Sequence, residues 1–177
     1  ASWPRTEGQI PVYYAHKSTG RPAEGAGTTQ YQDPFRSIFI DEVNAPLFSF
    51  GEGLSYSTFE YRGLEVLTPA LLLNGTLKVR AIIKNTSTRA GEEIVQLYVR
   101  DLVGSVTRPV KELQGFQRID LQPGEARQVV FEVPVAQLSF HGLDMKYRVE
   151  PGDYRLWIGP NSTSGLEGSF EVLPEGH

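Results

Sequence analysis

Few side chains in this sequence could carry chemistry, and three carboxylates stand out because they lie in an aromatic-rich stretch. Asp41, Glu42 and Glu52 fall within residues 1–57, among tyrosines and phenylalanines that would suit stacking on a sugar. Hydrolysis of a glycosidic bond needs two carboxyl groups about 5 to 9.5 Å apart. Most acidic residues, however, are simply solvated at the surface. We therefore interpret Asp41 as a turn or ion-pair residue and Glu52 as part of an exposed loop, and we predict no catalytic residue.

The other residue types that catalyse reactions form no motif. His141 lies in a predicted loop, and His16 lies beside Tyr13 and Tyr14, where aromatic rings could also line a sugar pocket. Neither histidine has an identifiable carboxylate partner, so we interpret both as structural. The sequence contains no Gly-x-Ser-x-Gly elbow for acyl transfer, and residues 51–53 lack the third glycine of a dinucleotide-binding loop.

The composition excludes further classes of site and partner. The 177 residues include no cysteine, which excludes disulfides, thiolate zinc sites, iron–sulfur clusters and a cysteine nucleophile. The three histidines are scattered, so we predict no metal site and no cofactor. The net charge is −4 and no basic stripe is present, which argues against a nucleic-acid partner. The longest apolar run, residues 69–73, is far too short to span a membrane.

The elements that would position these side chains are strands. Apolar and polar residues alternate in four runs, at residues 76–84, 93–101, 127–133 and 153–159. Because successive side chains of a strand point to opposite faces, each run predicts a half-buried strand. Weaker candidates are residues 37–40, 64–68, 110–121, 145–150 and 168–173, and residues 135–138 could form one helical turn. We expect Glu92, Glu93 and Glu112, at strand edges, to face solvent.

The connections between these runs are turns. Glycines at positions 75, 91, 124 and 152 stand where positive φ is expected, two of them directly after a proline. Seven or eight strands with a turn every 8 to 12 residues or so, and no helices between them, predict a two-sheet antiparallel β-sandwich. The fold class is therefore all-β, and without the cysteine–tryptophan signature of antibody domains it is fibronectin type III-like or immunoglobulin-like.

Residues 1–57 differ from the rest of the chain in composition and in the lack of a periodic pattern. Aromatic residues are frequent there, but prolines and glycines interrupt the stretch and no periodic element could pack them into a core. We predict two units: residues 1–57, an irregular aromatic-rich N-terminal extension, and residues 58–177, the sandwich. We expect residues 47–59 to lie against the sandwich, and residues 3–31 to be loose until they meet another body or another copy of the chain.

Several strings of residues, collinear over nearly the whole chain, resemble the C-terminal part of glycoside hydrolase family 3 β-glucosidases. Residues 3–14, WPRTEGQIPVYY, resemble the segment that closes the α/β sandwich domain of that family, and residues 46–59, PLFSFGEGLSYSTF, resemble the string that leads into its fibronectin type III-like domain. Residues 91–99, GEEIVQLYV, and residues 108–116, RPVKELQGF, resemble strands of that domain. Glu52 departs from the family, which usually has an aromatic residue or histidine there.

The resemblance implies a parent enzyme that removes terminal β-D-glucosyl residues with retention of configuration. In the family the nucleophilic aspartate and the acid/base glutamate lie upstream of the matching strings, so no catalytic residue carries over to this sequence. The expected function is then non-catalytic stabilisation of the upstream catalytic domains, in the periplasm or outside the cell. Self-association is a further expected partnership, and an independent module that binds carbohydrate or protein remains the alternative.

Overall fold

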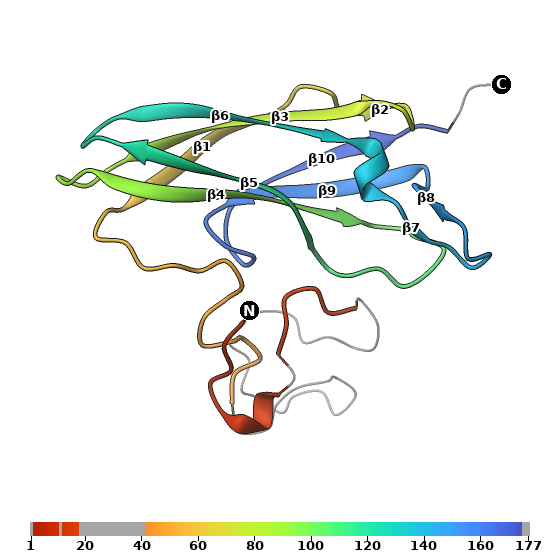
Figure 1. Ribbon diagram of the computed structural model, residues 1–177, viewed down its shortest axis with the longest axis horizontal. Helices are drawn as coiled ribbons and strands as arrows, with labels where there is room; N and C mark the ends of the chain where they lie inside the picture. Colours follow the sequence, from red (N-terminus) through yellow and green to blue (C-terminus); the bar gives the residue numbers. More distant parts are fainter. Residues whose placement is uncertain (1, 11, 18–41, 175–177) are drawn as a thin grey trace.

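The computed structural model describes residues 2–10, 12–17 and 42–174, and it shows a sandwich of two β-sheets (Figure 1). The smaller sheet has the strand order β1-β3-β6 and the larger one has the order β2-β10-β9-β4-β5. The elements are η1 (Glu7–Gln9), β1 (Phe59–Val66), β2 (Ala70–Leu71), β3 (Thr76–Asn85), β4 (Gly91–Asp101), β5 (Glu112–Leu121), β6 (Ala126–Pro134), η2 (Val135–Leu138), β7 (Phe140–His141), β8 (Tyr147–Arg148), β9 (Gly152–Gly159) and β10 (Leu166–Val172).

The predicted all-β sandwich is confirmed, and the four strongly alternating runs correspond to β3, β4, β6 and β9. The predicted helical turn at residues 135–138 is the 3-10 helix η2. The candidate at residues 64–68 is displaced, because β1 begins already at Phe59, and the short strands β2 and β7 were not foreseen. The candidate strand at residues 37–40 lies outside the described residues.

The core lies between the two sheets and follows the alternation in the sequence. On β3, the side chains of Leu77, Val79, Ala81 and Ile83 are completely buried. The β6 partners of the first three are apolar as well, so that Val79 lies opposite Phe131, whereas Ile83 lies opposite Arg127. Burying one such side chain contributes about 1.5–3 kcal/mol, which makes this interior the main stabilising element of the fold.

Two features of the connections differ from the sequence-based expectation. The sheets are antiparallel except at one edge, where β2 pairs with β10 in parallel. Positive φ is found at Gly124 (76°) and Gly152 (153°), but not at the glycines at positions 75 and 91. Gly91 is instead a site of close approach, since a Cβ there would lie 2.5 Å from the Ser57 hydroxyl oxygen. A glycine is therefore needed at position 91 because the Ser57 side chain packs against it, and not because a turn requires positive φ there.

The middle of strand β4 is buried on both faces, which corrects the prediction of a strand half-buried along its length. Residues 95–99 are all buried, including Gln96 and Tyr98, whose side chains point away from the core. Residues 2–10, 12–17 and 42–57 cover this outer face; we call them together the docked segment, and they lie side by side below the sandwich (Figure 1). Trp3 and Phe48 form a β-bridge within the docked segment.

The docked segment makes defined contacts with the sandwich. The expectation that residues 47–59 lie against the sandwich holds at Phe50, whose carbonyl oxygen accepts a hydrogen bond from the Ser162 amide at 2.9 Å. Residues 12–17 belong to the stretch that we expected to be loose, yet they also contact the sandwich, since the carbonyl oxygen of His16 accepts a hydrogen bond from the Val110 amide at 2.9 Å. Residues 18–31 lie outside the described residues. No helix in the described part of the chain is long and apolar enough to cross a membrane.

Candidate functional site

The joint between the docked segment and the sandwich is organised around the amide of Gln96. Its Nε2 donates to the carbonyl oxygens of Gly51 at 3.0 Å and Pro160 at 2.5 Å, which lie on the two sides of the joint. Its Oε1 accepts a hydrogen bond from the Tyr98 hydroxyl at 2.5 Å. Gln96 is only 4% exposed, so these bonds compensate for a buried polar group that would otherwise destabilise the fold.

Aromatic side chains fill the space beside this amide. The ring of Tyr14 stacks on Phe50 with centroids 4.1 Å apart and meets Tyr98 edge-on at 5.8 Å. The Tyr14 hydroxyl accepts a hydrogen bond from the backbone amide of Leu113 at 3.3 Å, which connects it to the start of β5. Burial raises the pKa of the Tyr98 hydroxyl, so this group acts as a neutral donor. The tyrosines therefore serve as packing residues with one polar anchor each.

A hollow of about 450 Å³ opens between the docked segment and the outer face of the larger sheet. Tyr13, His16, Arg100, Lys111 and Trp157 are among the residues that line it. The Lys111 ammonium donates to the carbonyl oxygen of Ser162 at 3.0 Å and lies 4.1 Å from the centroid of the Trp157 ring. Burial lowers the pKa of the Lys111 ammonium. We call this space the cationic hollow.

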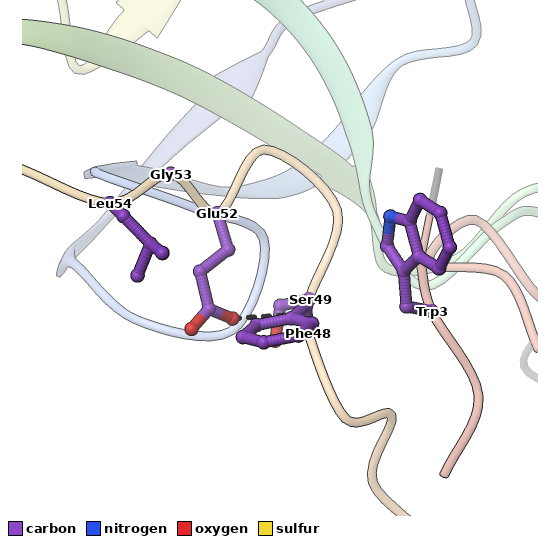
Figure 2. Close-up of a pocket in the computed structure, with 6 residues that line it drawn as sticks. All are labelled: Trp3, Phe48, Ser49, Glu52, Gly53 and Leu54. Atoms are coloured by element: carbon purple, nitrogen blue, oxygen red, sulfur yellow. Dashed lines mark hydrogen bonds between the residues drawn. The ribbon is translucent and has the colours of Figure 1, made fainter. Parts of the chain in front are cut away.

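A second hollow, of about 360 Å³, lies within the docked segment itself and is lined by Trp3, Phe48, Ser49, Glu52, Gly53 and Leu54 (Figure 2). Figure 2 shows the Glu52 carboxylate turned toward Ser49, and its Oε2 accepts a hydrogen bond from the Ser49 amide at 2.8 Å. The Glu52 amide in turn donates to the Ser49 carbonyl oxygen at 3.1 Å. Glu52 thus closes a turn in an exposed loop, which agrees with the structural interpretation.

The other predicted candidates are not brought together into a catalytic pair. Glu42 accepts a hydrogen bond from the Val43 amide at 2.9 Å and lies 3.9 Å from the Arg5 guanidinium, while Asp41 lies outside the described residues. His16 is exposed, and its Nδ1 lies 3.2 Å from the Lys17 carbonyl oxygen. His141 is exposed and packs beside Tyr147 with ring centroids 5.0 Å apart. Within the described residues, no three histidine, aspartate or glutamate side chains are arranged to hold a metal ion.

One of the glutamates expected to face solvent does not. Glu92 is exposed and pairs with Arg118. Glu93 is half-buried at a core-facing position of β4, where its Oε1 accepts a hydrogen bond from the Tyr61 hydroxyl at 3.0 Å and burial raises the pKa of its carboxyl. Glu112 is also half-buried, and it pairs with Arg108 at 2.6 Å. The expectation is therefore wrong for Glu93, because β1 of the opposite sheet covers it.

Sequence reasoning missed the residues that form the joint. In the alternating run at residues 93–101, Gln96 falls on the face opposite Val95 and Leu97, which predicts a solvent-facing side chain, and no motif includes Lys111 or Trp157. One signal was available: the outer face of this strand carries a tyrosine, Tyr98, beside the glutamine. A large amphipathic ring on a strand face that is expected to contact solvent indicates that another segment covers that face.

Comparison with known proteins identifies the domain in this chain. Residues 93–162 match the fibronectin type III-like domain. The chain carries a fibronectin type III-like domain. This match covers β4 to β9 and the loop that follows, which include Gln96, Lys111 and Trp157 of the joint.

The similarity to whole relatives extends beyond this domain. A periplasmic β-glucosidase of Salmonella typhimurium is 41% identical over 97% of the chain, which covers 22% of that protein. A putative β-xylosidase of Formosa agariphila is 36% identical over 96% of the chain, which covers 20% of it. The crystal structure of a β-glucosidase of Listeria innocua superimposes with a TM-score of 0.87 at 39% identity, over 97% of the chain and 23% of that protein.

These comparisons confirm the resemblance to the C-terminal part of family 3 β-glucosidases that the sequence strings indicated. The relation to glycoside hydrolases covers both the docked segment and the sandwich, since nearly the whole chain is matched. The chain spans only about a fifth of the length of the relatives it matches.

Proposed function

We propose that this chain is a non-catalytic portion of a β-glucosidase-like glycoside hydrolase and stabilises the catalytic domains of that enzyme. The relatives that support this carry names of β-glucosidases and β-xylosidases, and about four fifths of each lies outside the match. The parent enzyme would remove terminal β-D-glucosyl residues with retention of configuration. It would act outside the cytoplasm, since the Salmonella relative is named a periplasmic β-glucosidase.

The observation that carries the proposal is the apolar surface of the docked segment. Trp3 is 65% exposed, Leu54 and Tyr56 are each 94% exposed, and Phe48 is 41% exposed. Exposed apolar surface concentrated on one segment marks an interface in soluble proteins. These side chains stay exposed although the docked segment is bound to the sandwich, so their surface is available to a second body such as a catalytic domain.

The experiment is an exchange of matching parts. The part of the Listeria innocua β-glucosidase that this chain matches is replaced by residues 1–177, and hydrolysis of an aryl-β-glucoside is measured beside the melting temperature. We expect the hybrid to be active, and an enzyme lacking that part altogether to melt lower and lose activity. The chain alone should show no turnover, because the described part of the chain brings none of the candidate carboxylates together as a nucleophile and acid/base pair.

A matched pair of variants makes the test specific to the proposed surface. Leu54→Ser in the hybrid removes an almost fully exposed apolar side chain from the docked segment and should lower the melting temperature of the hybrid. Leu143→Ser changes a similarly exposed leucine, 80% accessible, in the loop between β7 and β8 and should have no effect. Turnover by the isolated chain that Glu52→Gln abolishes, or equal effects of the two leucine variants, would contradict the proposal.

A further inference from the structure

The positive charges of the cationic hollow outnumber the carboxylates beside it. Arg100 and Lys111 line it together with the imidazole of His16, and no acidic side chain is among its described lining residues. The half-buried Lys111 ammonium bonds to a carbonyl oxygen and is attracted by the Glu167 carboxylate, but that carboxylate is already paired with Arg155 at 3.2 Å and accepts a hydrogen bond from the Trp157 indole at 3.1 Å. A further anion beside the ammonium would offset more of the cost of burying its charge.

The register of the larger sheet adds to this imbalance. Arg100 on β4 lies directly opposite Arg155 on β9, so two guanidinium groups share the outer face of the sheet. Arg155 forms an ion pair with Glu167 at 3.2 Å, whereas the guanidinium of Arg100 has no hydrogen bond or ion pair to the described part of the chain. Like charges directly opposite each other destabilise a sheet. The unpaired guanidinium of Arg100 is a planar donor fork that fits a carboxylate.

The remaining walls of the hollow are those of a sugar site rather than of a bare ion site. Tyr13, which is 53% exposed, and the indole of Trp157 provide aromatic surface, and Ser162 and Thr163 provide polar groups at the rim. A volume of about 450 Å³ lies within the range of small-ligand sites, which is roughly 300–1,000 Å³. A lone inorganic anion would leave most of this space and its aromatic surface unused.

We propose that the cationic hollow binds a sugar that carries a carboxylate, of the uronic acid class. Arg100 and Lys111 hold the carboxylate, and Tyr13 and Trp157 contact the pyranose ring. The site is separate from the apolar surface that carries the proposed function, so it is expected to work in the 177-residue chain by itself.

The test is a titration of the full chain with sodium D-glucuronate, followed by tryptophan fluorescence and by amide chemical shifts at Lys111 and Thr163. Two controls are titrated at the same ionic strength. D-Glucose lacks the carboxylate and so tests its contribution to binding, and sodium acetate lacks the sugar ring and so tests the contribution of the ring. We expect glucuronate to bind at least tenfold more tightly than either. Binding should also raise the pKa of the Lys111 ammonium, since an adjacent anion favours its charged form.

Two arginine variants locate the site. Arg100→Gln should weaken glucuronate binding at least tenfold without changing the melting temperature, because Arg100 has no partner in the described structure. Arg62→Gln, an exposed arginine on β1 of the other sheet, should leave binding unchanged. Equal binding of glucuronate and glucose, equal binding of glucuronate and acetate, or no binding by a folded chain would each overturn the proposal.

Discussion

The sandwich and the docked segment are stabilised in different ways, although they lie in one chain and share a joint. The sandwich interior is a continuous set of apolar side chains, with Leu77, Leu97, Leu156 and Ile158 completely buried. The docked segment has one 3-10 helix of three residues and is held by a few separate contacts, chiefly those of Gln96 and of the rings beside it. Apolar burial is non-directional and adds up over area, whereas a hydrogen-bonded joint depends on individual atoms.

This difference indicates how each region responds to change. A continuous core distributes the loss of one contact over many neighbours, but removing a large side chain leaves a cavity that the surroundings only partly fill. In the joint, the loss of one amide breaks the bonds on both of its sides. We therefore expect mutations in the core to lower the stability of the whole domain, and mutations in the joint to release the docked segment while the sandwich stays folded.

The largest effect is expected in the core, at Phe131. This side chain is 4% exposed and lies opposite Val79 across the smaller sheet. Phe131→Ala should lower the free energy of unfolding by roughly 3–5 kcal/mol, through lost burial and a residual cavity. Gln128→Ala, on the exposed face of the same strand, should cost less than about 0.5 kcal/mol. Denaturant unfolding measures both, and equal shifts of the two midpoints would mean that the faces of β6 are assigned wrongly.

The next largest effect is expected in the joint, at Gln96. Gln96→Ala removes the hydrogen bonds that Nε2 donates to Gly51 and Pro160 and leaves the buried Tyr98 hydroxyl without its acceptor, at a cost of about 1–3 kcal/mol. Amide hydrogen exchange reports where that energy is lost. Exchange should accelerate at Ser162 and Val110, whose amides donate to the docked segment, and should stay slow along β3.

Two glycines of the docked segment provide a matched pair for the same contact. Gly51 has a φ of 79°, and a Cβ there would lie 2.0 Å from the Oε1 atom of Gln96, so Gly51→Ala should also release the docked segment. Gly53 has no atom within 4 Å of the corresponding position, so Gly53→Ala should be tolerated. Faster exchange along β3 in Gln96→Ala or Gly51→Ala would show that the joint and the core unfold as one unit.

The same difference explains how much of the fold the sequence could predict. Strands such as β3 and β6 alternate strictly, so their bounds and their buried faces follow from local pattern. The parallel pairing of β2 with β10 involves two residues in each strand and leaves no periodic signal. Gly91 was predicted from a turn rule, but its role depends on Ser57, which is distant in the sequence. Long-range contacts of this kind are not visible in a local pattern.

The candidate site was less predictable for a related reason. The interpretation of Glu52 as part of an exposed loop agrees with the structure, because a carboxylate three residues from Ser49 can close a turn locally. The cationic hollow needs Tyr13, Arg100 and Trp157, which come from three distant parts of the chain. The pairing of β4 with β9 brings Arg100 and Trp157 together, and the docking of residues 12–17 adds Tyr13. The spacing of these residues in the sequence predicts neither step.

The smallest effect is expected at two adjacent glutamates of β4, the half-buried Glu93 and the exposed Glu92. They test whether a carboxyl at the end of the core and one at the surface change the free energy of unfolding with pH in the same way. Burial raises the pKa of the Glu93 carboxyl in the folded state, while the hydrogen bond from Arg118 holds the pKa of the exposed Glu92 carboxyl below its usual value. In the unfolded chain both should ionise near the ordinary glutamate pKa of about 4.3. The two residues therefore affect stability in opposite directions as the pH changes.

The signs follow from proton binding. Between the ordinary pKa and the raised one, folded protein holds more protons on Glu93 than unfolded protein does, so the free energy of unfolding falls as the pH rises through this window. Glu93→Gln does not titrate and can still accept the hydrogen bond from Tyr61, so the variant should gain stability relative to the parent chain between pH 4 and pH 7. Glu92→Gln should lose stability relative to the parent over the same range, because the contribution of a carboxylate with a lowered pKa is present only at the higher pH. Denaturant midpoints at the two pH values measure both differences, and a change of the same sign in the two variants would show that Glu93 is as solvated as Glu92.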